Sequence, residues 1–344
     1  MARGVRARRA TIERPGKSER PDGGDDDPLT PNAATGSDAD QIIDEARRRT
    51  VSRRELSGSP VFEEISPEVG EIDEAALSEA LEADPDELMS LLAQMSQATD
   101  VGLRSKAKQR AARLFLDLAR TRSVETSGIG RVVTAPYRPD GGDLDIERSI
   151  EGIIAARAER RLVDPDQLAI RSWARPSTAW CLAIDRSGSM HGRPLATAAL
   201  AAAAVAVRAE RDAAQHAYAV LSFGRDVVAP KAMWEVRSTD DLLDRVLALR
   251  GHGTTDVAKA LWSAGAQLRT SAASRRVTIL MSDCRSTEPG DAVAAGRSLD
   301  ELVILAPEGD SAEAAELADA TGARWTTVDG PSSIIAALGR LLDR

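Results

Sequence analysis

The stretch Thr178-Ala-Trp-Cys-Leu-Ala-Ile-Asp-Arg-Ser-Gly-Ser-Met190 decides the fold of this 344-residue chain. Its first seven residues are almost all apolar, which is typical of a central parallel strand that is buried on both faces. Polar residues follow directly, at the carboxyl end of the strand, where open α/β sheets bind their ligands. Asp185, Ser187 and Ser189 are spaced two apart in this short loop, so their oxygen atoms can turn toward one point. A capped turn uses the same residue types, and the loop alone does not separate the two readings.

Short β-branched apolar runs alternate with helical segments from residue 177 to the C-terminus. This alternation predicts an α/β fold with a doubly wound, mostly parallel sheet. The predicted strands cover residues 178–184, 217–223, 226–229, 276–282, 301–306 and 324–328. The predicted helices lie near residues 193–211, 238–249, 256–269, 290–298, 311–320 and 331–342.

The first half of the chain has a different composition and no strand pattern. Residues 1–36 are rich in Arg, Asp, Gly, Pro and Ser, which predicts a disordered tail. Residues 37–122 read as an all-helical N-terminal region, because apolar residues recur at helical spacing between turn signals. Residues 123–174 read as an irregular connector followed by a helix from Ile146 to Arg161. The α/β domain then covers residues 175–344.

Composition excludes several classes of protein. The formal net charge of -9 argues against a general nucleic-acid binder. The longest apolar run, Leu195 to Val207, is shorter than the ~20 residues of a bilayer span, so we expect a buried helix and no membrane partner. The N-terminus has no apolar signal region, and we therefore expect a cytoplasmic location. Cys181 and Cys284 are predicted near opposite ends of neighbouring strands, too far apart for a disulfide.

Two further segments complete the pattern that begins at Asp185. The first is Gly251-His-Gly-Thr-Thr-Asp-Val-Ala-Lys-Ala-Leu261, at the start of a predicted helix, and the second is Val277-Thr-Ile-Leu-Met-Ser-Asp283, a predicted strand that ends in an acid. Together the three parts resemble the metal-ion-dependent adhesion site of the von Willebrand factor A (VWA) family. That site consists of Asp-x-Ser-x-Ser, then a Thr, then an Asp, each on its own strand-end loop. The resemblance implies a Rossmann-like VWA domain over residues 175–344.

The resemblance also implies the metal and its ligands. Ser187, Ser189 and Thr255 would reach the cation directly or through water, and Asp185 and Asp283 would mostly hold its waters. Such an all-oxygen site suits Mg²⁺, with Mn²⁺ or Ca²⁺ as alternatives. In the family a partner protein's Asp or Glu completes the coordination. Thr254 follows a glycine, as the family's threonine often does, and is the alternative to Thr255.

The connector narrows the resemblance within the VWA family. The segment Tyr137-Arg-Pro-Asp-Gly-Gly-Asp-Leu-Asp-Ile146 is similar to the Gly-Asp-Leu-Asp segment that precedes the VWA domain of CoxE-like proteins. These bacterial proteins work beside MoxR-type AAA+ ATPases and are related to the D subunit of magnesium chelatase. The resemblance implies a metal-dependent adaptor for such an ATPase, in client remodelling or metalloprotein maturation. A stand-alone VWA scaffold or sensor without an ATPase is the alternative.

An enzyme is the third reading of the same residues. A serine hydrolase would use Ser187 or Ser189 with His191 or His252, which lie on loops beside the predicted site. The sequence has neither a Gly-x-Ser-x-Gly elbow nor a phosphate-binding Gly-x-x-x-x-Gly-Lys-Ser/Thr loop, so we expect no enzyme. The two histidines could instead bind the metal and favour zinc. Cys284 has no Cys-x-x-Cys partner and reads as a core or rim residue.

Overall fold

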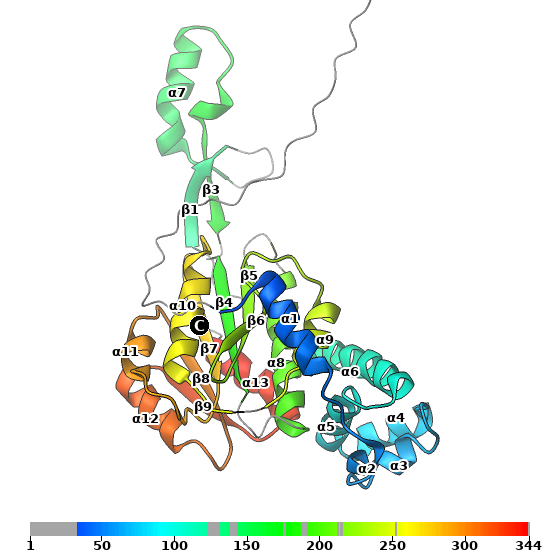
Figure 1. Cartoon of the computed structure of the whole chain (residues 1–344). Coiled ribbons are helices and arrows are strands. Elements are labelled where there is room, and N and C mark those ends of the chain that lie inside the picture. The colour runs from blue at the N-terminus through cyan, green and yellow to red at the C-terminus, as the bar shows by residue number, and fades with distance from the viewer. Residues whose placement is uncertain are drawn as a thin grey trace, which may run out of the picture. The chain divides into compact units, whose positions relative to one another are not determined.

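A computed structural model describes residues 33–122, 131–137, 143–174, 177–186, 192–211, 213, 216–251 and 253–342. All of these residues belong to one compact unit that spans Pro31–Arg344. The chain runs from a set of helices through a small antiparallel sheet into a larger α/β domain (Figure 1).

A six-stranded sheet forms the centre of the α/β domain, with the order β6-β5-β4-β7-β8-β9. Five strands are parallel, and the edge strand β6 runs antiparallel to β5. The strands are β4 (Thr178–Asp185), β5 (His216–Phe223), β6 (Val227–Lys231), β7 (Arg275–Met281), β8 (Leu302–Pro307) and β9 (Arg324–Val328). Each lies within two residues of its predicted range, and the predicted fold class is confirmed.

Helices cover both faces of this sheet (Figure 1). Helices α8 (Arg193–Glu210), α9 (Thr239–Leu247) and α13 (Pro331–Leu342) share a buried cluster with Trp180 and Leu182 of β4. Helices α10 (Val257–Arg269), α11 (Ala292–Arg297) and α12 (Ala312–Thr321) share another with Cys181 and Ala183. Alternate residues of β4 therefore enter opposite cores, as the two-residue period of a strand requires.

The helical region packs on the α/β domain through α8. It contains α2 (Arg53–Leu56), α3 (Phe62–Ile65), α4 (Glu74–Ala83), α5 (Pro85–Met95) and α6 (Val101–Arg122). Helices α5 and α6 contact α8, and Leu92 and Phe115 belong to the same buried cluster as the alanines of α8. The apolar run of α8 is thus buried on both sides, as predicted. Among the helices in the described ranges, none is long and apolar enough to cross a membrane.

Two parts of the chain differ from the prediction. Ala34 forms a parallel bridge with Val228 of β6, and α1 (Gly36–Arg47) buries Ile43 against the same strand. Ordered structure therefore begins before residue 37; residues 1–32 lie outside the described residues. The short helices α2 and α3 were not predicted, because four residues show too little periodicity.

The predicted connector contains a sheet, which corrects the prediction of an irregular segment before residue 146. Strands β1 (Arg131–Pro136), β2 (Asp143–Leu144) and β3 (Ala169–Ala174) form an antiparallel sheet of order β1-β3-β2. Helix α7 (Ile146–Ala158) follows β2, as expected, and ends three residues before Arg161. The pairing of β1 with β3 joins segments far apart in sequence, so the local pattern did not reveal it.

Candidate metal site

Asp185 ends β4 and is almost fully buried at the carboxyl edge of the sheet. Because Ile184 pairs with Met281 of β7, Asp185 lies beside Ser282, the next residue of the neighbouring strand. The Ser282 Oγ donates a hydrogen bond of 2.5 Å to Asp185 Oδ2 and accepts one of 2.9 Å from the Cys284 backbone N–H. Ser282 therefore fixes the Asp185 carboxylate to the turn that carries Asp283. Its place directly before Asp283 was the only sequence signal for this role.

Asp283 lies in the turn that follows β7. Its Oδ1 accepts a hydrogen bond of 3.0 Å from the backbone N–H of Arg285, and the side chain is partly exposed. Cys284 adopts a left-handed conformation with φ of 65°, so the chain turns away from the direction of β7 at this residue. Both cysteines are free, with Cys181 buried and Cys284 half-buried, as the predicted separation requires.

The loop that carries Thr255 is hydrogen-bonded to the turns that follow β5 and β7. The backbone N–H of Asp256 donates to the carbonyl of Gly224 at 3.0 Å, and Gly224 directly follows Phe223, which pairs with Asp185. On the other side, the Thr255 carbonyl accepts hydrogen bonds from the backbone N–H groups of Thr287 and Glu288, at 2.9 and 3.2 Å. Asp185, the loop of Thr255 and the turn of Asp283 are thus connected through hydrogen bonds.

The two neighbouring threonines have different surroundings. The Thr254 hydroxyl donates a hydrogen bond of 2.5 Å to Glu288 Oε1. Thr255 is 4% exposed, and its hydroxyl makes no hydrogen bond to a described residue. Helix α10 begins after Asp256, whose carboxylate accepts from the Lys259 N–H at 2.8 Å. The helix therefore starts within one residue of its predicted limit at 256. Of the two threonines, Thr255 is the one whose hydroxyl makes no hydrogen bond to a described residue.

A cleft opens beside these loops, at the carboxyl ends of β4, β7, β8 and β9. It has a volume of about 190 Å³. Asp185 and Asp283 form one part of its lining, and the apolar side chains of Leu305, Pro307 and Val328 form another. A molecule that approached the acids from this cleft would therefore meet an apolar wall next to a polar edge.

The helical region contacts the chain directly after the Ser187–Ser189 loop. Gly192 has a φ of 57°, and a Cβ atom there would lie 2.7 Å from both Ser90 Oγ and Gln94 Nε2 of α5. Only glycine combines this conformation with such a close approach. Helix α5 therefore packs closely against Gly192, the N-cap of α8.

Asp86 of α5 joins this contact to the last helix of the chain. Its Oδ2 accepts from Arg193 Nη2 at 3.0 Å, and its Oδ1 accepts from the backbone N–H of Ser332, near the start of α13, at 2.8 Å. One carboxylate of the helical region thus joins the start of α8 to the start of α13. These contacts were not predicted.

The family model for "VWA domain containing CoxE-like protein" matches residues 109–324, well over half of the chain. The chain belongs to this family. The match includes Asp185, Thr255 and Asp283, and it begins within α6 of the helical region. The predicted VWA and CoxE-like resemblance is confirmed. Among curated proteins, none matches the sequence.

Several solved structures share a likeness with the VWA domain. An aerotolerance-related membrane protein from Bacteroides fragilis NCTC 9343 is 17% identical with a TM-score of 0.40, covering 48% of this chain and 98% of that one. A von Willebrand factor type A protein from Catenulispora acidiphila is 16% identical with a TM-score of 0.37, covering 49% and 42%. Manganese-loaded Plasmodium vivax TRAP is 16% identical with a TM-score of 0.38, covering 49% and 74%. With TM-scores below 0.5, none of these bears on the function of this chain.

Two of the five residues predicted to hold a metal lie outside the described residues, Ser187 and Ser189, as do His191 and His252. The described members of the set are two acids and one hydroxyl. Within the described ranges, His, Cys, Asp and Glu side chains form no group of three or more that could hold a metal. Three of the five predicted residues supply hydroxyls, so the prediction places only two acids in the set. The uncommitted Thr255 hydroxyl and the all-oxygen donors fit a hard cation such as Mg²⁺.

Arg186 adds a buried positive charge next to Asp185. The residue is 6% exposed, and its Nη2 donates to the Asp226 carbonyl at 3.1 Å. Burial lowers the pKa of the Arg186 guanidinium, whereas the nearby Asp226 and Asp185 carboxylates act in the opposite direction. Arg186 therefore offsets part of the negative charge that Asp185 brings into this buried edge.

We expect Thr255→Val to weaken Mg²⁺ binding by about 1–3 kcal/mol, the cost of one lost polar contact in a buried place. Thr254→Val should change metal affinity little, because its hydroxyl is bonded to Glu288. Thr255→Ser, which keeps the hydroxyl, is the matched control and should bind nearly as the wild type does. Calorimetric titration of the three variants measures this. A larger loss for Thr254→Val would assign the cation to Thr254.

Proposed function

We propose that this CoxE-like chain is a metal-dependent protein-binding adaptor that works in the cytoplasm with a MoxR-type AAA+ ATPase. In this proposal Asp185, Ser187, Ser189, Thr255 and Asp283 hold Mg²⁺, and Mn²⁺ or Ca²⁺ can replace it. An Asp or Glu of the partner protein completes the coordination. The ATPase's work would then be coupled to client remodelling or metalloprotein maturation.

The observation that carries the proposal is that Thr255, 4% exposed, has a hydroxyl that makes no hydrogen bond to a described residue, on a loop hydrogen-bonded to the turns that follow β5 and β7. A hydroxyl oxygen in this position can bind a hard cation directly or hydrogen-bond to one of its waters. The neighbouring Thr254 hydroxyl donates to Glu288, so of the two threonines only Thr255 has a hydroxyl that is not bonded within the described residues.

The chemistry of the set favours binding over catalysis. Mg²⁺ held by two carboxylates and neutral hydroxyls keeps exchangeable waters, and these can give way to an anionic group. A carboxylate of a partner meets that need. The cleft beside Asp185 and Asp283 would receive the partner's adjacent apolar side chain against Leu305 and Val328. In this proposal the residues of this chain hold the cation and position the partner's carboxylate, and none of them acts as a nucleophile.

The ATPase is proposed from the CoxE-like family match and from the sequence itself. This chain carries no phosphate-binding Gly-x-x-x-x-Gly-Lys-Ser/Thr loop, so the nucleotide chemistry would come from a separate protein. A stand-alone VWA scaffold or sensor would use the same metal site with a client and no ATPase.

Affinity purification of the tagged full chain from the cells that produce it tests this function. We expect a MoxR-type AAA+ ATPase to co-purify in Mg²⁺ and to be lost in EDTA and in the Ser187→Ala/Ser189→Ala variant. The Ser78→Ala variant, which changes an exposed serine of α4, is the control. A client captured in the same metal-dependent way without an ATPase would support the scaffold. Capture that is equal in EDTA would contradict metal bridging.

The same preparations test the hydrolase alternative. The purified chain should hydrolyse neither nucleotides nor acyl esters. Turnover that is present in the wild type and absent in the Ser187→Ala/Ser189→Ala variant would establish the hydrolase instead.

A further inference from the structure

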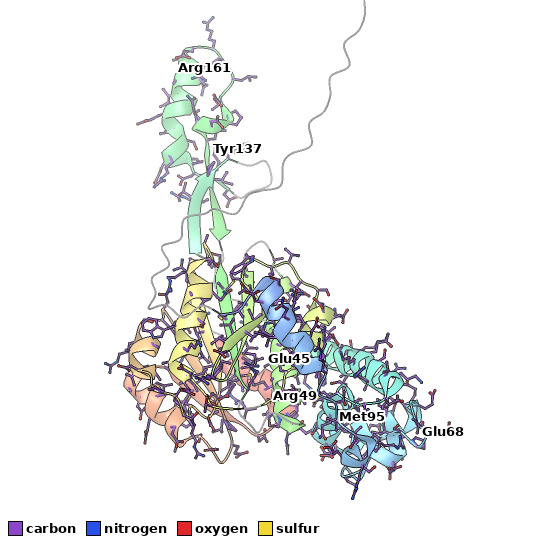
Figure 2. The ribbon with its side chains drawn as sticks, viewed as in Figure 1. Glu45, Arg49, Glu68, Met95, Tyr137 and Arg161 are labelled. Carbon is purple, nitrogen blue, oxygen red and sulfur yellow. The ribbon has the colours of Figure 1, made fainter. Side chains whose placement is uncertain are left out.

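A small arm consists of strands β1, β2 and β3 and helix α7, and Figure 2 labels Tyr137 and Arg161 in it. Helix α7 packs on the sheet of this arm with one side only. Ser149 Oγ accepts a hydrogen bond of 2.9 Å from the backbone N–H of Ala169, which begins β3. A Cβ atom on Gly152 would lie 2.7 Å from Gln167 Cβ. The side of α7 that carries Ser149 and Gly152 is therefore filled by the arm itself.

A second side of α7 carries an exposed apolar stripe. Ile146, Ile150 and Ile154 are 63%, 45% and 61% exposed, and their spacing of four residues places them in one row along the helix. Leu144 before the helix and Leu162 after it are exposed as well. Six of the twelve exposed large apolar side chains in the described part of the chain belong to this arm. This concentration marks an interaction surface rather than scattered exposure.

The charges of the arm indicate what covers the stripe. Acidic side chains gather at the start of α7 and basic ones at its end. The acids are Asp143, Asp145, Glu147 and Glu151, and the bases are Arg157, Arg160 and Arg161, with Arg148, Arg171 and Glu159 as exceptions. Some of these charges are paired within the arm, since Glu147 contacts Arg171 and Glu159 contacts Arg161. Arg157 forms no ion pair with a described residue. A helix with one acidic and one basic end is complementary to a reversed copy of itself.

We propose that α7 pairs in antiparallel fashion with α7 of a second copy of this chain. A two-fold axis at Ile150 would place Ile146 of one copy against the partner's Ile154. Arg157 would then lie four residues along the axis from the partner's Glu147, about 6 Å at 1.5 Å per residue, within reach of its side chain. Antiparallel helices also bring opposite ends of their dipoles together.

The size of the surface sets the strength of this dimer. Helix α7 has 13 residues and is therefore about 20 Å long. One such helix per copy buries less than the roughly 800 Å² per partner of a standard stable interface. The dimer is accordingly concentration-dependent, with a dissociation constant in the micromolar range or weaker. This pairing does not depend on the metal site, and it would place two VWA domains in one assembly.

Sedimentation equilibrium of the full chain over a series of concentrations tests the pairing. We expect a monomer–dimer equilibrium for the wild type and a monomer at every concentration for Ile150→Asp. Val236→Asp is the matched control, because Val236 is a fully exposed apolar residue outside the arm, and this variant should dimerise as the wild type does. A wild type that stays monomeric, or a dimer that Ile150→Asp leaves intact, would overturn the proposal.

A charge exchange tests the antiparallel orientation and does not rely on the apolar stripe. Arg157→Glu and Glu147→Arg should each weaken the dimer by roughly 3- to 10-fold, since each changes two symmetric contacts. The double variant Glu147→Arg/Arg157→Glu should regain the wild-type dissociation constant. If both single variants dimerise more weakly and the double variant does not regain the wild-type dissociation constant, the antiparallel arrangement is overturned.

Discussion

Replacing Phe115 by alanine is expected to lower the free energy of unfolding by about 3–5 kcal/mol. Phe115 lies in α6, is fully buried, and shares its cluster with alanines of α8 and with Leu182 of the central strand. The small alanine side chains of α8 cannot expand into the space that the ring leaves, so the cavity persists. Urea denaturation followed by far-UV circular dichroism measures the loss.

The same measurement shows whether the helical region and the VWA domain unfold together. Leu261→Ala, on α10 at the opposite face of the sheet, should cost about 2–5 kcal/mol. Because α5 and α6 share a core with α8, both variants should shift one common transition. Two transitions, with Phe115→Ala shifting only one of them, would contradict a shared core.

The parts of the fold that were predictable have strong local patterns. The strand that ends at Asp185 is almost all apolar before that residue, and its neighbour that ends at Met281 has a mainly apolar run from Val277, so both strands could be predicted from composition to within one residue. The antiparallel sheet of the arm could not be predicted from a local pattern of this kind. Its strand Arg131–Pro136 is short and pairs with Ala169–Ala174, which lies beyond a helix. Such pairing is determined by contacts that a local pattern does not contain.

The candidate metal site likewise contains residues that the sequence predicts and residues that it does not. The sequence places Thr255 just before a helix predicted from residue 256, and the helix indeed follows its N-cap Asp256. Ser282 and Glu288, which hold Asp185 and Thr254, were not identified, because a serine or glutamate in a loop has many ordinary roles. The hydrogen bond from Arg193 to Asp86 joins residues that are 107 positions apart. A periodic sequence pattern does not relate residues at that separation.

Removing both acids of the site is expected to abolish metal binding. Asp185 and Asp283 are the only anionic groups in the assigned set, and the remaining ligands are neutral hydroxyls. Mg²⁺ gives up its waters reluctantly, and neutral hydroxyls alone offset little of that cost. Loss of a group that orients the ligands or waters of a metal typically costs about 10- to 100-fold in affinity, so the pair should cost at least about 100-fold.

Two controls separate this loss from unfolding and from a general effect of charge. The Asp300→Ala/Asp310→Ala variant removes two acids from the surface outside the site and should bind metal as the wild type does. The far-UV circular dichroism spectrum of the Asp185→Ala/Asp283→Ala variant should match that of the wild type. The strands are stabilised by the apolar clusters on the two faces of the sheet, to which neither acid belongs.

Isothermal titration calorimetry of Mg²⁺ and Mn²⁺ into the full chain is the most direct test of the proposed metal site. We expect about one ion to bind per wild-type chain, and no measurable binding to the folded Asp185→Ala/Asp283→Ala variant. Equal binding by the wild type and this variant would contradict the site, and so would a wild type that binds neither ion.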